Sequence, residues 1–341
     1  MRIALDATYS LGENLSGVGV YSRELLNGLA ASPPGADWEW FYRWQPFWKA
    51  RTLPLPPRVH RRLLADSFGS RSAGIFHGLN QRLPRRRFRR QVATFHDLFV
   101  LTAEYSTAEF RARFAEQARH AAEGADLVIA VSAFTASQVE DLLKVPAARI
   151  RVIHHGVIPL PIPALHREKV VLCVGAIQKR KNQAGLVKAF TAMPVDWSLI
   201  LAGSEGYGAE EVRAAIAASP ARDRIQVTGY LSPTELAACY ARASIFAFPS
   251  FDEGFGMPVL EAMEAGIPVI AGNRSALPEV CGDAALMVDP HSVQDLAQAL
   301  RDLARGETVN QDLVEKGKTQ VQSFSWAKAV QETLNVYNEL I

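Results

Sequence analysis

Short apolar runs alternate with amphipathic stretches along most of the chain, and this alternation limits the fold more than any other feature of the sequence. The pattern is typical of parallel strands joined by crossover helices, which cover both faces of a sheet. In the first half we expect strands at 2–8, 74–79, 91–97, 126–132 and 150–155. Helices are expected at 19–31 and 107–123, the second opening on a capping box of Ser106 and Glu109.

A proline-spaced segment, "GVIPLPIPALHREK" at 156–169, interrupts the alternation. Three prolines at alternate positions disfavour a helix or a central strand, so the segment is interpreted as a linker between domains. The alternation then resumes, with strands expected at 170–176, 198–203, 225–230, 244–250 and 268–272. The sequence therefore predicts an α/β protein of two doubly wound, Rossmann-like domains, 1–160 and 161–325, followed by an amphipathic helix at 326–341.

Composition excludes several classes of protein. The chain is 48% hydrophobic and 21% charged over 341 residues, which suits two globular domains with sizeable cores. The N-terminal "MRIALDATYS" lacks a long apolar stretch, so we expect neither secretion nor a membrane span, and a cytoplasmic location. Cys173, Cys239 and Cys281 are far apart and odd in number, which favours reduced thiols over a disulfide framework or a metal cluster.

The stretch "FDEGFGMPVLEAMEAGIPVI" at 251–270 has the strongest functional pattern. Glu253 lies in a glycine-rich loop after an expected strand, and Glu261 lies just inside the helix that Pro258 favours. Glycines let the backbone N–H groups of 255–257 approach a ligand closely. Carboxylates accept hydrogen bonds, so the two glutamates are suited to bracket the hydroxyl groups of a sugar or ribose.

The nine residues "EGFGMPVLE" resemble the E-x7-E signature of glycosyltransferase family 4, whose members are retaining enzymes of the GT-B fold. The resemblance implies two Rossmann-like domains facing a central cleft, with the helix at 326–341 crossing back onto the first domain. It also implies that Glu253 lies beside the donor sugar and that Glu261 holds the ribose. The backbone of Phe255, Gly256 and Met257 would contact the donor sugar.

Two further segments resemble the parts of this family that bind the donor diphosphate. "VGAIQKRKNQAGLVKAF" at 174–190 places Arg180 and Lys181 where two cations beside a helix start suit a diphosphate. The family often has an arginine where this chain has Ala176, so more of the work falls to Arg180. "SGVGVYSREL" at 16–25 resembles the family's N-terminal glycine loop, with Gly17 and Gly19 meeting the diphosphate.

The remaining matches concern the sugar, the base and the acceptor. "VATFHDL" at 92–98 places His96 at the end of a strand, where the resemblance gives it a catalytic position beside the reacting sugar. "TGYLSPTEL" at 228–236 matches the segment that contacts the base, here Gly229, Tyr230 and Leu231. "IFHGLN" contains His77 and Asn80, which are candidates for the acceptor side.

The resemblance implies a retaining hexosyltransferase that needs no cofactor, since its co-substrate is a nucleotide sugar. No D-x-D motif is present, so no metal site is expected. The donor most favoured is GDP-mannose and the acceptor is a hydroxyl of a glycan or lipid-linked oligosaccharide. A transferase that uses a UDP-sugar, a UDP-sugar 2-epimerase and a non-catalytic subunit of the same fold remain as alternatives.

Charge is distributed unevenly along the chain. Residues 43–90 hold thirteen Arg and Lys and a single acid, Asp66, so this basic segment is about +12 while the rest is about −10, giving the net +2. The segment also contains Trp44, Phe47 and Trp48, and an arginine run at 85–87 and 89–90. We expect it to meet an anionic membrane surface, at the inner face of the cytoplasmic membrane, rather than a nucleic acid.

Overall fold

The structure is a computed structural model, and it describes residues 2–12, 14–32, 37–64, 73–163 and 166–341. Asp66, like the rest of 65–72, and residues 164–165 of the expected linker lie outside these ranges. Contacts divide the chain into two compact units. The N-terminal unit comprises Met1–Thr102, Thr107–Gly156 and Ser325–Ile341, and the C-terminal unit comprises Ala103–Ser106 and Val157–Phe324.

The N-terminal unit is built on a parallel sheet that has seven strands within the described residues, in the order β3-β2-β1-β4-β5-β6-β7. The strands are β1 (Arg2–Asp6), β2 (Asp37–Tyr42), β3 (Val59–Leu63), β4 (Ile75–Gly78), β5 (Arg90–Phe95), β6 (Leu127–Ala130) and β7 (Ile150–Val152). The α-helices are α1 (Gly17–Ala31), α2 (Trp44–Ala50), α3 (Phe99–Thr102), α4 (Ala108–Gly124), α5 (Ala133–Leu143) and α13 (Trp326–Asn338), and the 3-10 turns are η1 (Ala7–Ser10) and η2 (Ala147–Arg149).

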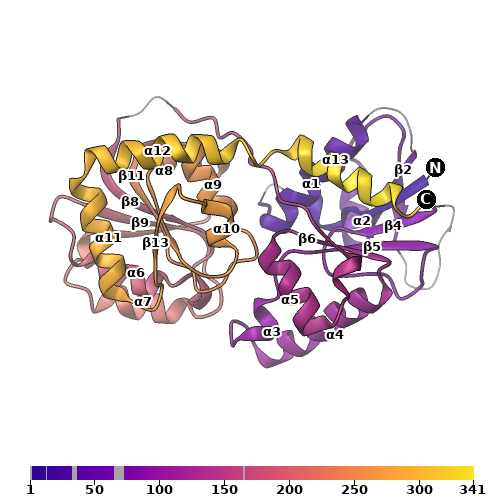
Figure 1. Ribbon diagram of the computed structural model, residues 1–341, viewed down its shortest axis with the longest axis horizontal. Coiled ribbons are helices and arrows are strands. Elements are labelled where there is room, and N and C mark those ends of the chain that lie inside the picture. Colours follow the sequence, from indigo (N-terminus) through magenta and orange to yellow (C-terminus); the bar gives the residue numbers. More distant parts are fainter. Residues whose placement is uncertain (1, 13, 33–36, 65–72, 164–165) are drawn as a thin grey trace. The chain divides into compact units, whose positions relative to one another are not determined.

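Both faces of this sheet are covered. Ile3 and Leu5 of β1 belong to a core formed with α1 and α13, whereas Ala4 belongs to the core on the α4 side. This alternation follows from the two-residue period of a strand. Helix α13 lies beside α1 (Figure 1), where Val330 packs against Gly28. The N-terminal unit is therefore completed by residues that follow the C-terminal unit in the sequence.

The C-terminal unit repeats the plan with a parallel sheet of six strands in the described part of the chain, in the order β10-β9-β8-β11-β12-β13. The strands are β8 (Glu168–Val174), β9 (Ser198–Ala202), β10 (Ile225–Gly229), β11 (Ala243–Phe248), β12 (Val269–Gly272) and β13 (Ala285–Val288). The helices are η3 (Lys179–Lys181), α6 (Gln183–Phe190), α7 (Ala209–Ala217), η4 (Arg222–Arg224), α8 (Pro233–Arg242), α9 (Met257–Glu264), α10 (Leu277–Cys281), α11 (Val293–Arg305) and α12 (Glu307–Val321).

The two-sheet α/β architecture is as predicted, and so are all ten expected strands, with ends that differ by up to three residues. Strands β2, β3 and β13 were not predicted. The linker is shorter than expected, because β8 already begins at Glu168. Helix α4 is capped by Thr107, whose Oγ1 accepts from the N–H of Phe110, and not by Ser106. No helix in the described ranges is long and apolar enough to cross a membrane.

Each sheet has one point where its strand order reverses direction. In the N-terminal unit this switch point lies between β1 and β4, and in the C-terminal unit between β8 and β11. Loops that leave two neighbouring strands there diverge to opposite faces, which opens a crevice at the carboxyl ends of the strands where ligands of such sheets bind. The switch points are therefore the places to look for a site.

Candidate functional site

Two cations and a carboxylate meet at the switch point of the C-terminal unit. Arg180 and Lys181 lie in η3, which follows β8, and Glu253 follows β11. Lys181 Nζ is 2.9 Å from Glu253 Oε1, and Arg180 Nη1 is 2.8 Å from Glu253 Oε2. All three side chains are only 10% exposed. We call this group the charge cluster.

The backbone around Lys181 is shaped to admit its side chain. Gly175 has φ +133°, and a Cβ added there would lie 2.8 Å from Lys181 Cε. Asn182 adopts the left-handed conformation at φ +55°, and its side-chain amide donates to the carbonyl of Pro290 at 2.6 Å. The ammonium group of Lys181 lies 4.4 Å from the centre of the Phe248 ring, a favourable cation–π contact.

Electrostatics keeps Glu253 ionised. Burial alone would raise its pKa, but the charges and hydrogen bonds of Arg180 and Lys181 outweigh burial and lower the pKa to about 2. Burial likewise lowers the pKa of Lys181, and the neighbouring carboxylate opposes that shift. Glu253 is thus a carboxylate at neutral pH, which can accept hydrogen bonds and has no proton to donate.

The loop after Glu253 holds the glutamate by its backbone and leads into α9. The N–H of Glu253 donates to Ser275 Oγ at 3.0 Å, and its carbonyl accepts from the N–H of Ala276 at 3.2 Å. Gly256, at φ +116°, is the N-cap of α9. Phe255 is buried, with its ring edge-to-face against Phe324. Met257, the first residue of α9, completes the segment expected to contact the donor sugar.

Glu261 lies on α9, one turn beyond Pro258, and is partly exposed. The hydroxyl of Tyr240 in α8 donates to Glu261 Oε2 at 2.7 Å. Burial raises the pKa of Glu261, and the hydrogen bond from Tyr240 offsets part of that shift. Tyr240 was not predicted from the sequence, because a contact between two helices leaves no spacing pattern to recognise.

The residues expected to read the base follow β10. Gly229 has φ +72°, and a Cβ there would meet nothing within 4 Å. Tyr230 is 47% exposed, and Leu231 precedes the capping box in which Ser232 and Glu235 start α8. This segment presents backbone and an aromatic side chain to solvent.

His96 belongs to the N-terminal unit and follows β5. Its ring lies parallel to that of His155, at 5.4 Å between centroids, and contacts the ring of Tyr21 edge-on at 4.6 Å. Nε2 is 2.9 Å from the carbonyl oxygen of Leu79, which can only accept, so Nε2 carries the proton. Burial lowers the pKa of His96 to about 4 despite this hydrogen bond. The imidazole is therefore neutral at pH 7, with Nδ1 as its acceptor.

The glycines of 16–25 lie in a helix and not in a loop, which corrects the prediction. Helix α1 starts at Gly17, two residues before its predicted start, with the Ser16 hydroxyl accepting from the N–H of Gly19. Gly17 is exposed and Gly19 is buried. A Cβ on Gly19 would lie 3.0 Å from the carbonyl oxygen of Tyr9, so the close approach there is to the chain itself.

The two residues proposed for the acceptor side differ in exposure. His77 is fully buried, and its ring nitrogens lie 2.6 Å from the hydroxyl of Tyr337 and 2.8 Å from that of Thr94. Its polar atoms are therefore used in joining α13 to the sheet. Asn80 is partly exposed, and its side-chain oxygen accepts from the N–H of Gln81.

Comparison with known proteins adds to this geometry. The chain matches the model described as "Glycosyltransferase Family 4" over residues 15–159 and the model "Glycosyl transferases group 1" over 161–320. It is 32% identical over 284 residues to the O-antigen chain mannosyltransferase B of Escherichia coli, covering 78% of this chain and 74% of the relative. The chain belongs to glycosyltransferase family 4. It is therefore a glycosyltransferase, as the motifs predicted.

Other similarities agree with this family 4 assignment. The serotype-specific mannosyltransferase WbdA of Escherichia coli is 28% identical over 64% of this chain, which spans 29% of that longer relative. Among solved structures, sucrose-phosphate synthase from Thermosynechococcus elongatus superposes with a TM-score of 0.79 at 22% identity, covering 99% of this chain and 98% of that one. WaaG, a glycosyltransferase of lipopolysaccharide biosynthesis, gives 0.75 at 14% identity, covering 98% and 99%. These structures share the GT-B fold predicted from the sequence.

Proposed function

We propose that this family 4 glycosyltransferase transfers mannose from GDP-mannose to a hydroxyl group of a glycan or lipid-linked oligosaccharide, with retention of configuration. The observation that carries the choice of sugar is the 32% identity to an O-antigen chain mannosyltransferase over most of both chains. The proposed enzyme works at the cytoplasmic side of the membrane and needs neither a metal ion nor a further cofactor.

The charge cluster supports the donor side of this proposal. A diphosphate leaving group gains negative charge as the bond to the sugar breaks, and fixed cations stabilise that charge best in a dry site. Arg180 and Lys181 are such cations, and both are held beside Glu253, with Arg180 also donating to the backbone carbonyl of Asp252. Glu261 would accept from the ribose hydroxyls, and residues 229–231 would contact the base.

The state of Glu253 suggests how it acts. A carboxylate whose pKa is lowered to about 2 by two cations is a weak base, so its ability to attack carbon is reduced. We therefore infer that Glu253 orients the sugar by accepting from its hydroxyls. The proton of the acceptor hydroxyl then goes to the departing phosphate oxygen on the same face, which yields retention. His96, neutral at pH 7, would accept from a sugar hydroxyl through Nδ1.

The direct test is an assay with purified enzyme, a panel of nucleotide sugars and acceptors that end in mannose. We expect transfer from GDP-mannose, an α-linked product by NMR, and full activity in the presence of a chelator. Thermal shift measures the nucleotide separately, because a ligand at 100 times its Kd stabilises by about 2.7 kcal/mol. Stabilisation by UDP and not by GDP would contradict GDP-mannose as the donor and favour a UDP-sugar. Epimerisation of a UDP-sugar without an acceptor would contradict the proposed transfer reaction.

Membrane docking forms the second part of the proposal, and the surface of the basic segment supports it. Trp44 and Trp48, both on α2, are 63% and 49% exposed, and Lys49 and Arg51 are exposed beside them. Tryptophan favours the membrane interface, and each cation near an anionic surface contributes about 1 kcal/mol. Phe47 instead packs partly into the core, and Phe88 is buried in a stack with Phe76.

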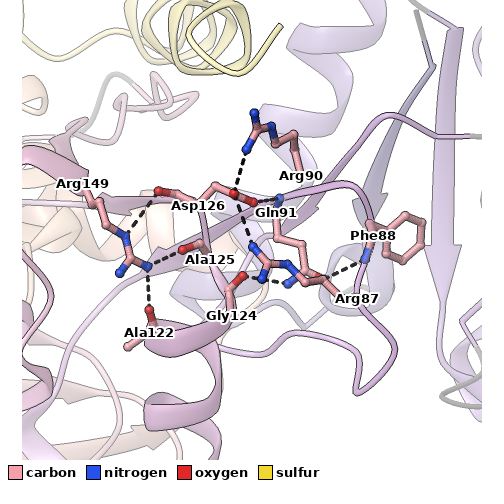
Figure 2. A network of polar contacts seen from close by, with 9 residues as sticks. All are labelled: Arg87, Phe88, Arg90, Gln91, Ala122, Gly124, Ala125, Asp126 and Arg149. Carbon is pink, nitrogen blue, oxygen red and sulfur yellow. Dashed lines mark hydrogen bonds and ion pairs between the residues drawn. The ribbon is translucent and has the colours of Figure 1, made fainter.

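The arginine run at 85–90 divides into two groups. Arg87 and Arg90 point toward Asp126 (Figure 2), at 3.3 and 3.2 Å from its Oδ1. The same carboxylate accepts from the backbone N–H of Gln91, so these two arginines help to join the loop to the α4–β6 turn. Arg86 and Arg89 are exposed and make no hydrogen bond or ion pair within the described residues. They are the better candidates for lipid headgroups.

Co-sedimentation with vesicles tests the docking. The wild type should bind vesicles that contain anionic lipid, with binding that falls as salt rises. The double change Arg86→Gln and Arg89→Gln should weaken binding, whereas the matched pair Arg113→Gln and Arg119→Gln on α4 should not. Equal binding to neutral vesicles, or equal loss with both pairs, would reject a docking surface at this segment.

A further inference from the structure

The N-terminal unit has a charged cavity of its own beside its switch point. The cavity has a volume of about 520 Å³ and is lined by Arg43, Arg82, Arg85, Glu116, Gln117 and His120. Its inner wall is the buried Leu83, which belongs to the core on the α4 side of the sheet. We call it the arginine pocket. No part of the donor site described above contributes to it.

The strand order explains why arginines gather there. Arg43 directly follows β2, and Arg82 lies in the loop after β4, so they come from the two strands that flank β1 in the sheet. Both reach residues at the carboxyl end of β1. Arg43 Nη2 is 3.7 Å from Asp6 Oδ2, and Arg82 Nη1 donates to the hydroxyl of Tyr9 at 3.3 Å. The two guanidinium groups thus flank the β1–β4 switch point.

The guanidinium groups of the pocket outnumber the carboxylates near them. Three arginines against Glu116 and the Asp6 that pairs with Arg43 leave a formal net charge of +1. Arg85 is exposed and makes no hydrogen bond or ion pair within the described residues, and the partner of Arg82 is the uncharged Tyr9. Arg43 Nε is buried without a hydrogen-bond partner. By contrast, Arg87 and Arg90 a few residues away share the carboxylate of Asp126 (Figure 2).

This chemistry matches a phosphate group. Guanidinium presents N–H donors in a planar fork that fits two phosphate oxygens, and it binds phosphate more readily than an ammonium group of the same charge. The oxygens of Glu116 and Gln117 accept hydrogen bonds, which suits hydroxyl groups attached to that phosphate. The volume lies in the range of pockets for small organic ligands.

We propose that the arginine pocket binds a phosphate ester that carries hydroxyl groups, the chemical class of a glycosyl phosphate. Arg43, Arg82 and Arg85 hold the phosphate, and Glu116 and Gln117 contact the sugar. Because Arg43 is also the N-cap of α2, whose exposed tryptophans are proposed to enter the membrane interface, the phosphate of a lipid-linked acceptor would arrive beside this pocket. Only that last assignment, to the acceptor, rests on the proposed function.

Calorimetric titration with mannose 1-phosphate tests the site, on enzyme saturated with GDP so that the donor site is filled. Repeating it in the Lys181→Ala background excludes residual binding there. Mannose 1-phosphate should bind and mannose should not. Arg82→Gln and Arg85→Gln should each weaken binding about tenfold, the effect of one lost charge-assisted contact. Arg119→Gln, which removes an exposed charge from α4 outside the pocket, should leave the Kd unchanged.

Two results would overturn the proposal. One is the absence of mannose 1-phosphate binding, and the other is an equal loss in all three variants, which would show only a general attraction of anions. Arg85 makes no hydrogen bond or ion pair within the described residues, so Arg85→Gln decides the matter even where Arg82→Gln disturbs the fold. Nucleotide binding is measured on the same samples. A failure of GDP and UDP to bind would count against the proposed function and leave the phosphate result standing.

Vesicles that contain phosphatidic acid distinguish the source of the phosphate. If the pocket takes a lipid-borne phosphate, Arg82→Gln weakens vesicle binding and mannose 1-phosphate competes with it. If it takes a soluble phosphate ester, Arg82→Gln leaves vesicle binding unchanged while Arg86→Gln still weakens it. Both patterns support the pocket as a phosphate site, and they assign different ligands to it.

Discussion

The two sheets carry opposite kinds of charged site at equivalent points. At the switch point of the C-terminal unit, Arg180 and Lys181 are buried and both contact the buried Glu253. At that of the N-terminal unit, Arg43, Arg82 and Arg85 line an open cavity, whose opposing charges are Glu116 and the Asp6 that pairs with Arg43. The same topology thus produces a buried, ion-paired arrangement in one unit and an accessible one in the other. The first suits fixed chemistry on a donor, and the second suits capture of an anionic group.

The largest effect on activity and stability should come from changing Glu253, the carboxylate that both cations of the charge cluster contact. Glu253→Gln should lower kcat by about 10²–10³-fold, as for removal of a group that acts on the reacting sugar. It should also lower the free energy of unfolding by about 3–5 kcal/mol, because two buried cations lose their carboxylate. Glu264→Gln, at the exposed last residue of α9, is the control.

The buried ion pairs of Glu253 should also make the stability of the protein depend on pH in the acid range. The pKa of Glu253 falls from 4.5 to about 2 on folding, so its ionisation stabilises the native protein above pH 4.5 by about 3 kcal/mol. That contribution disappears as the pH falls toward 2. The free energy of unfolding of the wild type, measured with urea, should therefore fall as the pH is lowered between these values. In Glu253→Gln this fall should be smaller by about 3 kcal/mol. Parallel profiles would show that the carboxylate is not held by the two cations.

Binding of the nucleotide tests the second glutamate. Glu261→Ala should weaken nucleoside diphosphate binding by about 1.5–3 kcal/mol, the range for a hydrogen bond to a charged group. Because burial raises the pKa of Glu261, affinity should already fall in mildly acidic solution, as protonation removes the acceptor. Tyr240→Phe removes the hydrogen bond that lowers this pKa, so the fall should move to higher pH. A Kd that does not respond to either change would remove Glu261 from the nucleotide site.

The close contact between Gly175 and Lys181 predicts that a substitution at Gly175 has an intermediate effect on stability and on diphosphate binding. Gly175→Ala combines an unfavourable backbone conformation with a Cβ 2.8 Å from Lys181 Cε, so it should destabilise by about 1–3 kcal/mol and also weaken diphosphate binding. Gly12→Ala is the matched control, with φ +111° and nothing within 4 Å of the added Cβ. Thermal unfolding and diphosphate titration of both variants separate backbone strain from displacement of Lys181. Equal diphosphate affinity in the two variants would show that Lys181 is not displaced.

The smallest effect is expected in the loop of the N-terminal unit. Arg87→Gln breaks an ion pair whose arginine is 61% exposed, so the change in unfolding free energy should stay within about 1 kcal/mol. Chemical denaturation measures it directly. A loss as large as that of Glu253→Gln would remove the contrast between the two units, since it would make an exposed pair equal to a buried one.

Most of the fold could be predicted because its central strands are buried on both faces and are therefore continuously apolar. Strand β3 escaped prediction because it lies at the edge of its sheet, where one neighbour is missing and polar residues are tolerated, as in "VHRRL". Strand β13 is apolar, but its run "ALMV" has only four residues. Strand β2 was missed although it is buried, because the charged Glu39 interrupts its aromatic run.

The candidate site was predictable to the extent that local motifs define it. Glu253, Arg180 and Lys181 were each named from their own segment, yet their mutual ion pairing required the positions of two separate strands. Tyr240 and Ser275 were missed for the same reason, since they act on Glu261 and Glu253 from other elements. His77 is the opposite case: a motif named it as a candidate, but both of its ring nitrogens are hydrogen-bonded, to Tyr337 and Thr94.

The placement of α13 has a consequence for biosynthesis. Residues 325–341 leave the ribosome only after the whole C-terminal unit has been made, yet Val330 and Tyr337 belong to the core of the N-terminal unit. Until they arrive, the apolar side of α1 lacks its cover, and His77 lacks the Tyr337 hydroxyl, one of its two partners. Domains usually fold in the order of synthesis, but here the unit made first is completed last. During synthesis the N-terminal unit therefore exposes the face that α13 covers in the finished protein.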